Sequence, residues 1–272
     1  MAGFKIACSS GVAQSHPLPT ALDTVRGLGI DCVDLLAIEN WSHLDPSSLV
    51  GRAHEEANHI SALAADRDLK LVALNTNVPR PLVNLSQETR NYNKEVMEAC
   101  LDFAHTCGIK IATMDPGRSA EGLSEEESFK FAKTELLQFV RLAYERDVTI
   151  TIETHMGSLA EDPQNALRFV EEIPGLKITY DPSHYIPAGI PLDETLCLLP
   201  HAAHAHIHNA GKDSYQERMD RQMIDTAWFK RVLRDHSYTG YVSIEYLERI
   251  AVRDGYDPVE QSRRLKVLLE KD

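Results

Sequence analysis

Residues 202–210 read AAHAHIHNA, and histidines alternate with small or aliphatic residues along this stretch. In a β-strand successive side chains point to opposite faces, so His204, His206 and His208 are expected to share one face. A row of three imidazoles fits a metal or proton-transfer site, and it also fits a set of hydrogen-bonded core histidines. The choice depends on whether other strands bring carboxylates to the same place.

Strand-like runs alternate with helical patterns on both sides of this stretch, which is typical of βαβ units and a parallel sheet. The expected strands are residues 5–10, 32–38, 69–75, 109–114, 148–154, 176–181, 202–210 and 241–246. The chain has 272 residues, and an eight-fold strand and helix barrel typically takes about 250. The sequence therefore predicts an α/β fold, a single (β/α)8 TIM barrel, with residues 1–272 as one domain.

Helix signals fill the segments between the strands. The expected helices are residues 20–28, 46–67, 86–107, 124–146, 191–199, 225–235 and 258–270, with a further helix that opens at residue 163. Ser124 and Glu127 form a capping box, and Gly108 stands where a left-handed helix end is expected. Asp45 and Asp162 each precede a proline that suits the first helical turn. The caps thus support the alternation of strand and helix.

Composition excludes several classes of protein. The formal net charge is -13 at pH 7, and no run of Lys or Arg offers a basic groove, so nucleic acid is not an expected partner. Five widely spaced cysteines without a CxxC pair argue against a disulfide framework or a thiolate zinc site. With no apolar leader and no apolar run that could span a bilayer, we expect a cytoplasmic protein without a membrane partner.

Carboxylates from three other strands are expected beside His208. Glu153 and Glu245 each lie on the polar face of a strand whose other face is aliphatic, and Asp181 ends the sixth strand. The inward face of a barrel can hold polar residues near the C-terminal strand ends, so these groups converge there. Buried charges are costly unless they are paired or bind a cation. These three carboxylates and one imidazole suit Mn, Mg or Co, and Zn is possible. The alternative interpretation is a group of buried ion pairs with a structural role.

The motifs around these residues carry a resemblance to a known family. They are Thr-Ile-Glu-Thr-His at Glu153, Asp-Pro-Ser-His from Asp181 to His184, His-Ile-His ending at His208, and Ser-Ile-Glu-Tyr at Glu245. Over essentially its whole length the chain resembles the xylose isomerase-like barrel superfamily, in particular the sugar phosphate isomerase/epimerase group with ketose 3-epimerases, hydroxypyruvate isomerase and inosose dehydratase. The resemblance implies that Glu153, Asp181, His208 and Glu245 bind one divalent metal ion, and that His184 contacts substrate.

The resemblance also implies a reaction. Two vicinal oxygens of a sugar or keto-sugar would bind the metal, which would stabilise an enediolate while Glu153 and Glu245 act as the acid and base. Isomerisation or epimerisation is therefore expected. Residues 155–159, HMGSL, replace the Glu-rich segment of ketohexose 3-epimerases, which leaves the substrate open. A metal-dependent lyase or dehydratase that acts beside a sugar carbonyl uses the same chemistry and is the alternative.

Other polar residues are candidates for substrate contact. His155 shares the parity of Glu153 and could line the pocket or make an ordinary hydrogen bond. His206 lies deeper than His208 and is expected to support it, whereas His204 belongs to the packed interior. Glu39 follows the second strand and could meet substrate or cap a helix.

A polar loop over residues 211–223 could cover the site. Arg218 and Lys212 in this loop could meet an anionic group, and solvated charges are the alternative interpretation for both. Trp41, near the second loop, could shield a pocket or pack against its neighbours.

Two hypotheses for a different kind of function stay open. An endonuclease IV-type DNA repair enzyme shares this barrel but uses three zinc ions, and Asn75 and Met114-Asp115 stand near the places of its additional metal histidines. The other hypothesis is a barrel that binds sugar without catalysing a reaction. The main prediction is a metal-dependent isomerase or epimerase with a small-molecule carbohydrate substrate, and the sequence leaves a homo-oligomer open.

Overall fold

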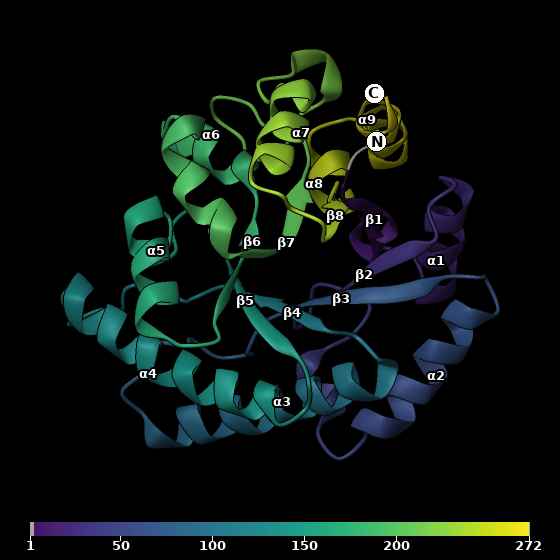
Figure 1. Cartoon of the computed structure of the whole chain (residues 1–272). Coiled ribbons are helices and arrows are strands. Elements are labelled where there is room, and N and C mark those ends of the chain that lie inside the picture. The colour runs from purple at the N-terminus through teal and green to yellow at the C-terminus, as the bar shows by residue number, and fades with distance from the viewer. Residues whose placement is uncertain (1–2, 272) are drawn as a thin grey trace.

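Eight parallel strands close into a barrel. The computed structural model describes residues 3–271. The strands are β1 (Lys5–Ser9), β2 (Cys32–Ala37), β3 (Lys70–Thr76), β4 (Ile111–Met114), β5 (Thr149–Glu153), β6 (Lys177–Tyr180), β7 (Ala202–Ile207) and β8 (Tyr241–Ile244). They pair in chain order, and β8 pairs with β1 to close the sheet. The strands form the centre and the helices surround them (Figure 1), so the predicted (β/α)8 TIM barrel is confirmed.

Helices cover the outer face of the barrel. They are α1 (Leu18–Gly27), α2 (Ala53–Ala65), α3 (Gln87–Cys107), α4 (Glu125–Tyr144), α5 (Pro163–Glu172), α6 (Tyr185–Ala188), α7 (Thr226–Asp235), α8 (Glu248–Arg253) and α9 (Pro258–Glu270). Short 3-10 helices lie at η1 (Ser10–Ala13), η2 (Pro46–Leu49), η3 (Pro182–His184), η4 (Leu192–His201) and η5 (Met219–Arg221). Within residues 3–271, no helix has both the length and the apolar character needed to cross a membrane.

The predicted caps of two helices are present. The Ser124 hydroxyl accepts the backbone N–H of Glu127, whose carboxylate accepts the N–H of Ser124 in return, so α4 begins with a complete capping box. Gly108 ends α3 with φ of 73°, the left-handed conformation that glycine adopts without a steric penalty.

Three expected elements differ from the structure. The single helix expected over residues 46–67 is divided into η2 and α2, because Gly51 adopts φ of 74° between them. The helix expected over residues 191–199 is the 3-10 helix η4. The strand expected over residues 202–210 ends at Ile207, so His208 begins the loop after β7.

Polar side chains fill part of the barrel interior, whereas the outer faces of the strands are aliphatic. On β5, Ile150 and Ile152 belong to the hydrophobic core, and Thr151 between them faces inward. The Thr151 hydroxyl oxygen lies 3.0 Å from that of Thr113 and 2.7 Å from that of Thr179. A buried hydroxyl without a partner costs about 1–3 kcal/mol. These contacts therefore let polar side chains fill the barrel below its C-terminal end.

The contact between α4 and α5 stabilises the side of the barrel next to β5. The rings of Phe129 and Phe169 stack with their centroids 4.1 Å apart. The Arg168 guanidinium lies 3.9 Å from the centroid of the Phe129 ring, and it donates to both carboxylate oxygens of Glu126 at 2.6 and 2.9 Å. Burial of a Phe side chain contributes roughly 1.5–3 kcal/mol to folding. The strand that ends at Glu153 thus lies against a well-packed helix pair.

Candidate metal centre

The four expected metal ligands lie at the C-terminal ends of four successive strands. Glu153 is the last residue of β5, and Asp181, His208 and Glu245 each follow the last residue of β6, β7 and β8. All four side chains are buried, and Glu153 is the most exposed at 8%. This end of the barrel is where TIM-barrel enzymes build their active sites.

One carboxylate oxygen of Asp181 has no hydrogen-bond partner among the described residues. Its Oδ1 accepts the backbone N–H of Ser183 at 2.8 Å and the Ser183 hydroxyl at 2.6 Å. Its Oδ2 lies 3.3 Å from Nε2 of His208 and has no hydrogen-bond partner within residues 3–271. Burial alone would raise the pKa of Asp181, but the positive charge of the nearby His208 imidazole outweighs burial and holds that pKa below its usual range. A buried, ionised oxygen without a donor fits a bound cation.

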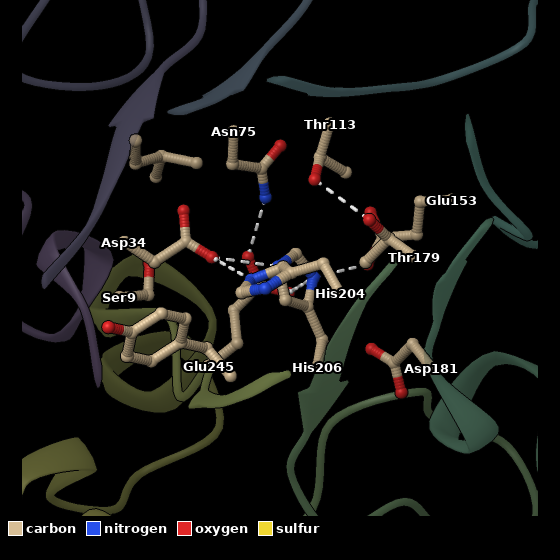
Figure 2. Close-up of polar contacts among 12 residues, drawn as sticks. Ser9, Asp34, Asn75, Thr113, Glu153, Thr179, Asp181, His204, His206 and Glu245 are labelled. Carbon is tan, nitrogen blue, oxygen red and sulfur yellow. Dashed lines mark hydrogen bonds and ion pairs between the residues drawn. The ribbon is translucent and has the colours of Figure 1, made fainter. Parts of the chain in front are cut away.

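The carboxylates of Glu153 and Glu245 meet at one imidazole. Nδ1 of His206 lies 2.6 Å from Oε1 of Glu153 and 3.1 Å from Oε2 of Glu245. Asn75 donates from Nδ2 to Oε1 of Glu245 at 2.8 Å, from the opposite side of that carboxylate (Figure 2). Burial opposes the charged imidazole, but the carboxylates of Glu245, Glu153 and Asp34 outweigh burial and hold the pKa of His206 well above its usual value.

Three overlapping groups of side chains among the described residues could hold a metal ion, and one of them is Asp34, His204 and His206. In the other two groups, ligand atoms within 4.8 Å of one another come from Glu153, Asp181, His206 and Glu245 and from Asp181, His184 and His208. Asp181 belongs to both of these groups, so it connects the paired glutamates to His208. Three of the expected ligands, Glu153, Asp181 and Glu245, thus share one group with His206, whereas His208 groups with Asp181 and His184 instead.

A small cavity opens above this centre. Its volume is about 250 Å³, near the lower end of the roughly 300–1,000 Å³ that small-molecule sites span. The cavity is lined by Leu36, Ile38, Trp41, Asn75, Thr76, Asn77, Asp115, Arg118, Glu153, His155, His184, His208, Tyr215, Glu245 and Leu247. A cavity of this size and polarity suits a small polar molecule.

Three rings form one wall of the cavity. The ring centroids of His155 and His184 are 4.1 Å apart, and those of His184 and Tyr215 are 5.0 Å apart. Burial and the nearby imidazole of His155 lower the pKa of His184 to about 3. Burial and the carboxylate of Glu245 raise the pKa of Tyr215 to about 12. His184 and Tyr215 are therefore neutral near pH 7 and can exchange hydrogen bonds with hydroxyl groups.

The structure places some of the expected substrate-contact residues outside the cavity. Oε2 and Oε1 of Glu39 accept the backbone N–H and the hydroxyl of Ser47 at 3.0 and 2.6 Å, so Glu39 caps the start of η2. Arg218 pairs with Asp220 at 2.6 Å on the surface of the loop. His206 is fully buried beneath the cavity. His155, His184 and Trp41 do line the cavity.

Several cavity residues were not expected from the sequence. Asn75, Asn77, Asp115 and Arg118 lie at or just beyond the ends of β3 and β4, and Tyr215 comes from the loop after β7. The Arg118 guanidinium donates to the carbonyl oxygens of Gly157 and Met156 at 3.3 and 3.4 Å, which holds it across the loop after β5. Their position in the sequence could have identified them, because residues that follow the strands of a barrel meet at its C-terminal end.

The comparisons with known proteins agree with this geometry. Residues 22–267 match a family model described as Xylose isomerase-like TIM barrel. A search of curated proteins gave no match.

Solved structures resemble the chain over nearly its whole length. A D-tagatose 3-epimerase-like protein has a TM-score of 0.78 at 19% identity, with 98% of this chain and 97% of that chain covered. The 3-keto-D-glucoside 4-epimerase YcjR from E. coli has a TM-score of 0.77 at 16% identity, with 98% of each chain covered. The probable 3-DHS dehydratase AsbF from Bacillus anthracis has a TM-score of 0.74 at 16% identity, with 99% and 100% covered. At these identities the likeness shows the shared fold.

Proposed function

Because the chain belongs to the xylose isomerase-like TIM barrel family, we propose that it is a divalent-metal-dependent isomerase or epimerase of a sugar or keto-sugar. The observation that carries the proposal is Oδ2 of Asp181, which has no hydrogen-bond partner among residues 3–271 and is buried 3.3 Å from Nε2 of His208, a residue that lines the small polar cavity. The structural likeness to proteins titled as sugar epimerases supports the same class of reaction.

Glu153, Asp181, His208 and Glu245 would hold the ion. Three carboxylates and one imidazole form an oxygen-rich set that suits Mn²⁺, Mg²⁺ or Co²⁺ and that also accepts Zn²⁺. When bound, such an ion supplies positive charge that lowers the cost of negative charge on the substrate oxygens.

Glu153 and Glu245 would move the proton. They come from strands β5 and β8, which are separated by two strands of the barrel, so they approach the cavity from different sides. One carboxylate removes the proton from the carbon beside the substrate carbonyl, and the other carboxylate returns a proton. Return to the same carbon from the opposite face gives epimerisation. Return to the former carbonyl carbon, with transfer of the hydroxyl proton from one substrate oxygen to the other, gives isomerisation.

The other cavity residues would orient the substrate. Asn75 holds one oxygen of Glu245, so this carboxylate keeps its direction during proton transfer. His184 is neutral near pH 7 and can bind a hydroxyl group without adding charge. His155 and Tyr215 stack beside it and restrict its rotation.

The proposal is tested by metal analysis and isotope exchange. We expect one divalent ion per chain and deuterium beside the carbonyl when candidate ketoses are incubated with the Mn²⁺-loaded protein in D₂O. Glu245→Gln and Asp181→Asn should lose both the ion and the exchange. Glu39→Gln should retain both, because Glu39 caps η2 outside the cavity. Three zinc ions, no ion, or no exchange with any sugar or keto acid would reject the proposal.

A lyase or dehydratase is the second candidate. Removal of the same proton, followed by loss of a hydroxyl group from the next carbon, would use the same two glutamates. The likeness to the probable 3-DHS dehydratase AsbF shows that this fold also occurs in a protein titled as a dehydratase. Analysis of the product separates the two candidates, because a dehydratase product lacks one molecule of water.

A further inference from the structure

We propose that Asp34, in the interior of the barrel, is a positioning residue for the candidate metal centre and acts on Glu153 and Glu245 through His206. The inference rests on the proposed function only in that these glutamates serve as ligands. Asp34 itself does not line the cavity and touches neither glutamate among the contacts of the described residues.

Asp34 binds two imidazoles with a single oxygen. It lies within β2 and is fully buried. Its Oδ2 accepts Nε2–H of His204 at 2.8 Å and Nε2–H of His206 at 2.9 Å. In the view of Figure 2 the two imidazoles lie between Asp34 and Glu153. Asp34 thereby connects strand β2 to the two imidazoles of β7 across the barrel interior.

His206 continues the connection to both glutamates. Its Nδ1 lies 2.6 Å from Oε1 of Glu153 and 3.1 Å from Oε2 of Glu245. The imidazole ring is rigid, so a hydrogen bond that fixes Nε2 also fixes the direction of Nδ1. One N–H group then holds two like-charged carboxylates close together. Without Asp34 the ring could rotate, and the glutamates would separate.

The pairing of Asp34 indicates more than a structural ion pair. Oδ1 of Asp34 has no hydrogen-bond partner within the described part of the chain, although Oδ2 has two. Burial lowers the pKa of His204, so His204 donates to Asp34 as a neutral imidazole, and an arrangement that maximised stability would use both oxygens of Asp34. The second contact on the same oxygen orients His206. Partners of this kind behind metal ligands typically change metal affinity by about 10–100-fold.

Asp34→Asn tests the inference, and His204→Asn is its matched control. Asp34→Asn keeps an acceptor oxygen but removes the negative charge that strengthens the hydrogen bonds from both imidazoles, whereas His204→Asn changes only the imidazole that contacts neither glutamate. We expect the dissociation constant for Mn²⁺, measured by titration calorimetry on the metal-free protein, to rise about 10–100-fold in Asp34→Asn. His204→Asn should stay within about threefold of the unchanged protein, well below that range.

His206→Asn provides a second route if Asp34→Asn does not fold. An Asn side-chain amide can replace Nδ1–H toward the glutamates but cannot reach Asp34, so this variant breaks the link between them and also removes the positive charge of His206. It should weaken Mn²⁺ binding by a similar factor, and the double variant with Asp34→Asn should be no weaker than His206→Asn alone.

Equal Mn²⁺ affinity in the unchanged protein, Asp34→Asn and His206→Asn would overturn this inference alone. An equal loss of affinity in His204→Asn and Asp34→Asn would also overturn it, because the effect would then be general damage to the interior. If the unchanged protein binds no divalent ion, this inference and the proposed function both fail.

Discussion

Asn75→Ala should weaken divalent-ion binding through Glu245. Asn75 donates to Oε1 of Glu245 at 2.8 Å, and a hydrogen bond to a charged group contributes about 1.5–3 kcal/mol. Asn75 is 8% exposed and lines the cavity, so water can enter the vacated space and replace part of the bond. We therefore expect the lower end of the range, about 1.5 kcal/mol, which corresponds to roughly a tenfold higher dissociation constant for Mn²⁺.

Asn77→Ala is the control for this prediction. Asn77 lines the same cavity, but its side-chain oxygen accepts the backbone N–H of Val78 and does not contact Glu245. Titration calorimetry with Mn²⁺ on both metal-free variants should show the tenfold change only in Asn75→Ala. Unchanged affinity in Asn75→Ala, or an equal loss in Asn77→Ala, would refute the argument that Asn75 acts through the Glu245 carboxylate.

Two further predictions concern His184 and Gly157. Folding lowers the pKa of His184 from 6.5 to about 3. Between these two values His184 binds a proton in the unfolded chain but not in the folded protein, so the free energy of unfolding falls as the pH drops below 6.5. Urea unfolding in EDTA should show that the unchanged protein loses about 1–2 kcal/mol more than His184→Asn between pH 6.5 and 5, and parallel pH profiles would contradict this. Gly157 and Gly108 adopt φ of 77° and 73°, so alanine at either should cost about 1–2 kcal/mol of unfolding free energy. Only at Gly157 would a Cβ meet Arg118, at 2.5 Å from Nη1. Because Arg118 lines the cavity, only Gly157→Ala should also raise the KM of the deuterium exchange. An equal KM in both variants would show that the position of Arg118 does not affect substrate binding.

The barrel was predictable from the sequence because it depends on local patterns. Alternation of aliphatic and polar residues along β5 predicts both the strand and the inward direction of Glu153, and the capping signals at Ser124 and Gly108 lie where α4 begins and α3 ends. The same parity places Glu245 and His208 at one end of the barrel. Errors arose where geometry depends on one backbone angle, as at Gly51, which separates η2 from α2.

The contacts inside the centre were harder to predict, because they join residues far apart in the sequence. Asp34 and His206 are separated by 172 positions, and Asn75 and Glu245 by 170. The sequence does contain one signal for Asp34, since it is a charged residue inside the apolar run of residues 32–37. Which imidazole it meets depends on how β2 and β7 face each other across the barrel, and no local pattern specifies that.

The turn after β6 limits how Asp181 can coordinate an ion. Oδ1 of Asp181 is held by two donors of Ser183, so the carboxylate offers only Oδ2. Asp181 can therefore act as a monodentate ligand but not as a bidentate one, unless the turn opens. Ca²⁺ takes about 6–8 oxygens and often binds carboxylates in bidentate fashion, whereas smaller ions accept fewer ligands. A serine hydroxyl two residues beyond the ligand would thus help this protein to discriminate against calcium.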